Sequence, residues 1–144
     1  MIGFLICGHG FFAEGVYSSV QLISGKQSNI QIVNFLEGDS LERLKEKILT
    51  AISKLETENG IVCFTDLPGG TPFNVCSSLA ASDANILVIG GINVPMLLSS
   101  LFIREKNLKE FADIVIKEGS ENIKIFHAGL FNKKHYIEEY EEGI

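Results

Sequence analysis

The first residues whose types could do chemistry lie in the stretch ICGHGFFAEG, residues 6–15. His9 stands there between Gly8 and Gly10, directly after an apolar run. A second stretch, TDLPGGTPFN at residues 65–74, places Asp66 directly after another apolar run. A carboxylate that accepts a proton from one ring nitrogen of a histidine fixes its tautomer and leaves the other nitrogen nucleophilic. His9 and Asp66 are therefore the candidate catalytic pair.

The turn Gly69-Gly70-Thr71 follows Asp66 and opens a predicted helix. Free N–H groups and the positive dipole end of a helix favour an anion, phosphate above all, and glycines let that anion approach the backbone. The imidazole of His9 could attack a phosphoryl group, and the turn would then hold the phosphate of the phosphohistidine. We therefore expect phosphoryl transfer, with Gly69, Gly70 and Thr71 binding the phosphate.

A competing interpretation treats residues 8–13 as the dinucleotide-binding pattern G-x-G-x-x-A. That interpretation needs an acidic residue at the end of the second strand, where Asn34 and Phe35 stand instead. It also gives TDLPGGTPFN no role. A nucleotide- or dinucleotide-binding module remains the alternative. Metal hydrolysis would need more ligands than His9 and Asp66, so we expect neither a metal nor another cofactor.

The elements that must position these residues are short apolar runs alternating with helical periodicity. This order predicts an α/β fold, a three-layer, doubly wound and mainly parallel sheet of about five strands with helices on both faces. In such sheets ligands bind beyond the carboxyl ends of the strands, where the loops carrying His9 and Asp66 would converge. Strands are predicted over residues 2–7, 30–35, 61–65, 86–89 and 123–127, and helices over residues 12–24, 40–56, 71–81, 94–104 and 108–118.

Two helix starts carry specific capping residues. Asp39 with Glu42 predicts a capping box at the start of the second helix. Thr71-Pro72 predicts an N-cap followed by proline at the first helical position of the third helix.

Composition narrows the class of protein. The 144 residues fit one domain, 1–144, whose last residues, 131–144, are an acidic tail or helix. The net charge of −6 argues against nucleic acid as a partner. Cys7, Cys63 and Cys76 lie in or beside apolar runs and are expected to be free core thiols in a reducing cytosol. With no convincing signal peptide and no segment long enough to span a bilayer, a cytoplasmic location is expected.

The motifs GHG, DLPGGTPFN and GINVPML together resemble a known family over residues 1–130. It is the enzyme IIA component of the mannose/fructose/sorbose family of the bacterial phosphoenolpyruvate-dependent sugar phosphotransferase system. The phosphorylated histidine of that family falls on His9 and its orienting aspartate on Asp66. Thr71 takes the place of a serine found in many relatives and keeps the hydroxyl.

The resemblance implies a set of partners. HPr would donate the phosphoryl group to Nε2 of His9, and the IIB component, as a separate polypeptide, would accept it. The membrane IIC and IID components would be served indirectly, through IIB. The resemblance also implies a homodimer in which the fifth strand, Ile123–His127, runs antiparallel and is exchanged between subunits. The phosphocarrier subunit of dihydroxyacetone kinase has a similar domain and is a second alternative.

Paired aromatic residues, Phe11 and Phe12, directly follow the GHG motif. A carrier must dock two proteins around one histidine. We therefore predict that one of the two rings packs against the first helix and that the other stays exposed in a docking surface. Burial of both rings is the commoner fate of phenylalanine and is the opposing expectation.

Overall fold

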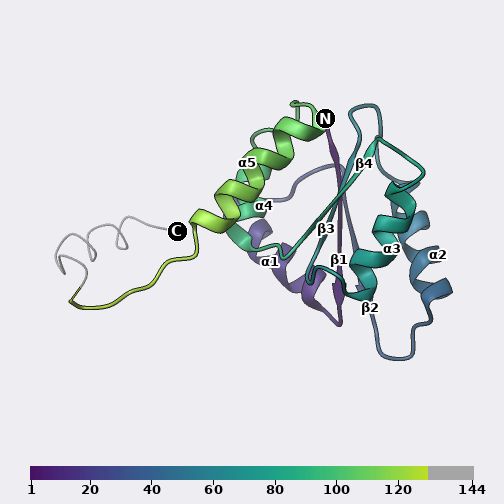
Figure 1. Cartoon of the computed structure of the whole chain (residues 1–144), viewed down its shortest axis with the longest axis horizontal. Coiled ribbons are helices and arrows are strands. Elements are labelled where there is room, and N and C mark those ends of the chain that lie inside the picture. Colours follow the sequence, from purple (N-terminus) through teal and green to yellow (C-terminus); the bar gives the residue numbers. More distant parts are fainter. Residues whose placement is uncertain (130–144) are drawn as a thin grey trace.

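The computed structural model describes residues 1–129 and shows a sheet of four parallel strands in the order β2-β1-β3-β4 (Figure 1). The strands are β1 (Gly3–His9), β2 (Ile30–Phe35), β3 (Ile61–Thr65) and β4 (Ile86–Gly90). The helices are α1 (Phe12–Ser24), α2 (Leu41–Ile52), α3 (Thr71–Ala80), α4 (Val94–Ser100) and α5 (Leu108–Glu121). The predicted three-layer parallel fold is confirmed.

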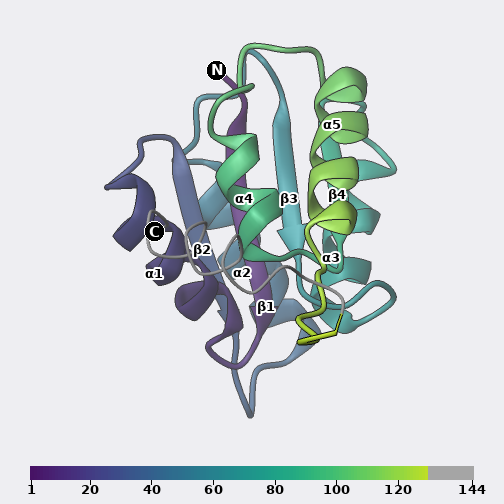
Figure 2. The same ribbon diagram turned by 90° about the vertical axis from the view of Figure 1, so that its left-hand side faces the viewer.

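The helices cover both faces of the sheet (Figures 1 and 2). Helices α1, α4 and α5 lie on one face, and α2 and α3 lie on the other. Strand β1 is central and its residues from Gly3 to Gly8 are all buried, so its apolar side chains alternate between two cores. Phe4 and Ile6 pack toward α1, α4 and α5, whereas Leu5 and Cys7 pack toward α2 and α3.

The three cysteines lie in the second of these cores. Cys7, Cys63 and Cys76 are free and fully buried among the residues beneath α2 and α3. Their expected role as core thiols is confirmed, and none of them is placed to act as an accessible nucleophile.

At the amino ends of the strands, Arg104 ties three segments together. Its guanidinium is buried and donates hydrogen bonds of 2.8–3.0 Å to the main-chain carbonyls of Ile2, Ser28 and Asn29. The guanidinium carbon also lies 4.4 Å from the centre of the Phe4 ring. Hydrogen bonds from a charged donor are worth about 1.5–3 kcal/mol each, so this residue fixes the end of the sheet opposite to His9.

The helix starts differ from the predictions in two places. Ser40, not Asp39, caps α2, and its hydroxyl accepts a hydrogen bond from the Arg43 N–H. Asp39 is instead engaged by Lys47, eight residues further along. Gly70 is the N-cap of α3, which moves Thr71 to the first helical position. Helix α4 also ends earlier than predicted, at Ser100.

The predicted fifth strand, expected to be exchanged between two subunits, is not seen in the single chain. Within residues 1–129, the segment 123–127 follows α5 with no strand pairing and remains exposed. A strand needs a neighbouring strand, and among the described residues the sheet ends at β4. The predicted acidic tail, residues 131–144, lies outside the described residues. Among the helices of residues 1–129, none has the length and apolar character required to cross a membrane.

Candidate functional site

The structure brings His9 and Asp66 together at the carboxyl ends of two adjacent strands. His9 is the last residue of β1 and Asp66 directly follows β3, whose Thr65 is paired in register with Cys7. One carboxylate oxygen of Asp66, Oδ2, accepts from the His9 backbone N–H at 2.8 Å and lies 2.9 Å from Nδ1 of the His9 ring. The other oxygen, Oδ1, accepts from the Leu67 N–H at 2.8 Å. The pairing predicted from sequence is confirmed as a contact.

This contact orients the imidazole. Because Oδ2 of an ionised carboxylate can only accept, the Nδ1 atom must carry the proton that it shares with Asp66. The neutral ring then has its lone pair on Nε2. The His9 side chain is 45% exposed and the Asp66 side chain only 14%, so the imidazole reaches solvent while its orienting group is shielded.

Two glycines make room for this arrangement. A Cβ atom on Gly8 would come within 2.8 Å of the Phe12 ring and 3.2 Å of Asp66 Oδ2. A Cβ atom on Gly70 would lie 2.9 Å from Cε1 of the His9 ring. Gly10 differs, because nothing lies within 4 Å of its added Cβ and its φ of +56° is what favours glycine. Gly70 therefore leaves room for the imidazole itself, whereas Gly8 leaves room for Phe12 and for the carboxylate that binds His9.

The turn before α3 reaches the same place. Gly69 adopts a φ of +80°, and the Gly70 N–H closes the turn by donating to the Leu67 carbonyl at 3.0 Å. The Gly70 N–H, which was predicted to bind the anion, therefore already has a hydrogen-bond partner within the turn. The first N–H groups of a helix have no carbonyl partner within it, so the helix end that begins at Thr71 remains an anion-favouring position next to His9.

The two phenylalanines after the GHG motif separate as predicted. Phe11 is 68% exposed, whereas Phe12 packs against the core formed with α1, α4 and α5. Leu67, the neighbour of Asp66, is also 57% exposed. Two apolar side chains are therefore presented to solvent beside the residues that surround the imidazole.

One contact of His9 was missed from the sequence. The Phe35 ring lies edge-on to the imidazole, with ring centroids 5.7 Å apart and planes 63° apart. Phe35 is the last residue of β2 and is paired in register with His9. Its position at a strand end next to β1 is the one sequence feature that could have indicated this contact.

The electrostatics of the site favour a charged carboxylate. Burial alone would raise the pKa of Asp66, but hydrogen bonds from the His9 N–H, the His9 ring and the Leu67 N–H outweigh it. The pKa of Asp66 is therefore lowered from its ordinary value of 3.8. At neutral pH Asp66 is ionised and able to hold the Nδ1 proton of His9.

Fold and site together define a class of protein, an α/β domain that presents a carboxylate-oriented histidine next to a helix N-terminus at the carboxyl edge of a parallel sheet. Residues 3–116 match the family model described as "PTS system fructose IIA component". The chain therefore belongs to the EIIA family of the phosphotransferase system, whose members are phosphocarrier components. This membership favours phosphoryl transfer over dinucleotide binding.

Similar proteins support the same assignment. The fructose-specific EIIA component of Bacillus subtilis is 34% identical over 105 residues, which cover 73% of this chain and 72% of that protein. The mannose-specific EIIAB component of Escherichia coli is 31% identical over 129 residues, 88% of this chain and 40% of that protein, so the chain matches only about two fifths of its length. The crystal structure of EIIA from Streptococcus agalactiae aligns with a TM-score of 0.80 at 33% identity, covering 88% of this chain and 98% of that one.

Replacing Asp66 by asparagine is expected to lower the free energy of unfolding by about 1–2 kcal/mol at neutral pH, because an amide oxygen accepts these N–H groups more weakly than a carboxylate. The lowered pKa of Asp66 means that its stabilisation is present above about pH 4 and is lost as the pH falls through the folded-state pKa. Urea unfolding of both proteins from neutral to acidic pH should show the difference shrinking on acidification. A difference that stays constant with pH would contradict this account.

Proposed function

We propose that this chain carries a phosphoryl group on Nε2 of His9, taking it from phospho-HPr and passing it to a IIB component in the cytoplasm. The observation that carries the proposal is the His9–Asp66 contact, which holds the proton on Nδ1 and leaves the lone pair on Nε2 of a partly exposed ring. Phosphoryl transfer needs positioning and charge stabilisation more than covalent chemistry, and both are available here. The membrane IIC and IID components would be served only through IIB.

In the transfer step Nε2 of His9 forms a bond to phosphorus while the bond from phosphorus to the donor histidine of HPr breaks. The electron pair of the broken bond returns to the donor ring. The new phosphohistidine carries positive charge on its ring, which the ionised Asp66 stabilises through the Nδ1 proton. The positive end of α3 at Thr71 offsets part of the charge on the phosphate oxygens, and Gly69 and Gly70 leave room for the phosphate beside it.

Incubation with phosphoenolpyruvate, enzyme I and HPr is expected to add the mass of one phosphoryl group to the intact chain. The modification should be acid-labile and alkali-stable, as expected for phosphohistidine, and absent from His9→Ala. His127→Ala is a matched control, because it removes an exposed histidine without touching Asp66. A wild-type chain that stays unmodified with competent donors, or a His9→Ala chain that is still modified, would refute the proposal.

We further propose that Phe11 belongs to the surface on which HPr and IIB dock. It is exposed beside His9, as is Leu67, and exposed aromatic side chains are frequent anchors of protein interfaces. Phe12, packed against the core, serves stability instead.

Phe11→Ala is expected to raise the KM for phospho-HPr while changing the free energy of unfolding by less than about 0.5 kcal/mol. Phe12→Ala should instead destabilise the chain by about 1–3 kcal/mol and leave KM unchanged. Transfer kinetics and urea unfolding of both variants distinguish the two roles. Equal destabilisation with unaltered transfer in both variants would exclude Phe11 from docking.

A homodimer built by strand exchange is the third part of the proposal. Among the described residues, strand β4 is an edge of the sheet. A groove of about 410 Å³ runs beside it, lined by Val88 and Ile89 of β4, by Ile116 of α5 and, where the chain leaves α5, by Ile123. The segment 123–127 carries Ile123 and Ile125, which are 77% and 68% exposed. An extended segment can add to a sheet edge through main-chain hydrogen bonds, so the segment 123–127 of a second copy is the occupant that this groove fits.

Sedimentation equilibrium of the wild-type chain is expected to give twice the monomer mass of 15.8 kDa. Ile125→Asp should shift the equilibrium toward monomer, because a carboxylate would have to be buried in the groove. Leu22→Asp is the matched control, since Leu22 is equally apolar and 88% exposed on α1. A monomeric wild type, or an Ile125→Asp chain as dimeric as the control, would overturn the exchange.

A further inference from the structure

Phe35, the last residue of β2, contacts the imidazole of His9 directly. Its ring is edge-on to the imidazole of His9, with 5.7 Å between ring centroids. Its backbone carbonyl accepts the Gly10 N–H at 2.7 Å, so the residue after His9 is also attached to Phe35. The ring packs against the core beneath α2 and α3, which limits how it can move.

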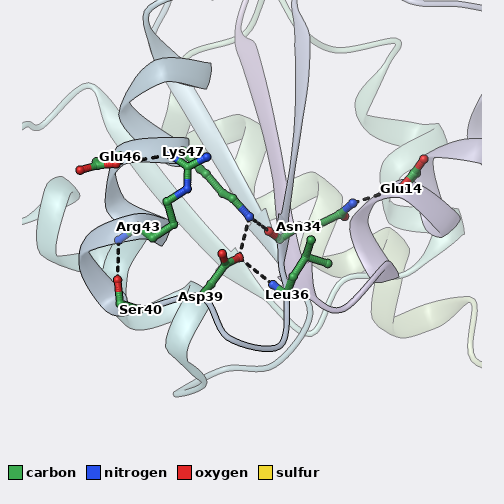
Figure 3. A network of polar contacts seen from close by, with 8 residues as sticks. All are labelled: Glu14, Asn34, Leu36, Asp39, Ser40, Arg43, Glu46 and Lys47. Carbon is green, nitrogen blue, oxygen red and sulfur yellow. Dashed lines mark hydrogen bonds and ion pairs between the residues drawn. The ribbon is translucent and has the colours of Figure 1, made fainter.

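The two peptide groups on either side of Phe35 are held by one ion pair (Figure 3). The Lys47 ammonium donates to the carbonyl of Asn34, the residue before Phe35, at 3.0 Å. The Asp39 carboxylate accepts from the N–H of Leu36, the residue after Phe35, at 2.9 Å. Lys47 and Asp39 also bind each other directly.

This ion pair is shielded and remains charged. The side chains of Asp39 and Lys47 are only 15% and 22% exposed. The pKa of Asp39 is lowered, first by its hydrogen bond with Lys47 and second by the Leu36 N–H. Strand β2 is an edge strand, so among the described residues no neighbouring strand fixes its outer side at Phe35. The Asp39–Lys47 ion pair instead fixes the backbone of β2 on both sides of Phe35.

We propose that Phe35 is a positioning residue for His9, and that the Asp39–Lys47 ion pair acts on the same histidine by fixing the backbone on both sides of Phe35. The proposal rests on the phosphocarrier function proposed above. Asp66 holds the imidazole at a single atom, Nδ1, about which the ring can still tilt. The Phe35 ring restricts that tilt, and Gly70 lies close to Cε1 of the imidazole. Nε2 is thereby aimed in one direction.

Three variants separate positioning from packing. Phe35→Leu keeps an apolar side chain but removes the flat ring beside His9. Lys47→Met keeps the aliphatic stem but removes the ammonium that binds Asn34 and Asp39. Arg43→Gln is the matched control, because Arg43 lies on the same helix, binds the exposed Glu46 through its side chain, and acts on Asp39 only as the weakest of the favourable charges and hydrogen bonds there.

The first measurement is the rate of phosphoryl transfer from phospho-HPr. Phe35→Leu is expected to lower the maximal rate about tenfold, and Lys47→Met about threefold, because a nucleophile that is out of line reacts slowly. KM should stay within about twofold for both, since neither residue is expected to contact HPr. Arg43→Gln should match the wild type in both quantities. A Phe35→Leu rate equal to wild type overturns the proposal, and a Lys47→Met rate equal to that of Arg43→Gln overturns the part played by the ion pair.

The second measurement is the nitrogen-15 spectrum of the His9 ring, which reports its tautomer and which a merely structural role would not alter. Phe35→Leu is expected to shift and broaden the Nε2 signal, because the ring can then tilt about Nδ1, while Nδ1 keeps the proton held by Asp66 and urea unfolding still shows a cooperative native state. Slower transfer with an unchanged ring spectrum and lower stability would assign Phe35 to packing alone. If the wild type takes up no phosphate, the proposed function fails, while the ring spectra still decide whether Phe35 positions the imidazole.

Discussion

The site depends on the Asp66 carboxylate, which joins the ends of two strands. Its Oδ2 accepts hydrogen bonds from the main-chain N–H and from the ring Nδ1 of His9. Its Oδ1 accepts a hydrogen bond from the main-chain N–H of Leu67. The bond from the His9 main chain fixes the end of β1, and the bond from the Leu67 main chain fixes the direction in which the chain leaves β3. The ring orientation follows from the same atom that fixes the backbone. Gly8 is the necessary counterpart, because any side chain there would press on this carboxylate.

Much of the fold follows from local patterns. The bounds of β2, β3 and α1 agree with those predicted from apolar runs and helical spacing, because each run is buried on the side that its period indicates. The meeting of His9 and Asp66 was predictable too. Adjacent parallel strands present their carboxyl ends at one edge, so two polar residues that end such strands must approach each other.

What the patterns missed depends on contacts between distant residues. Asp39 looked like a capping residue, but Lys47 on the facing turn of α2 and the Leu36 N–H engage it more strongly, and Ser40 takes over the cap. The proximity of Phe35 to His9 depends on the register of β1 with β2, which no local pattern specifies. The segment 123–127 was predicted as a strand, but within residues 1–129 it has no neighbouring strand to pair with.

The guanidinium of Arg104 makes the two ends of the sheet respond differently to acid. It binds the amino ends of the strands and stays protonated at any pH that a protein meets. The carboxyl ends are held by Asp66 and Asp39, which acid neutralises. Acidification therefore loosens one end of the sheet before the other. Amide hydrogens around His9 and Phe35 would become exchangeable while those near Ile2 and Asn29 are still protected. Local unfolding would therefore begin at the carboxyl ends of the strands and reach their amino ends last.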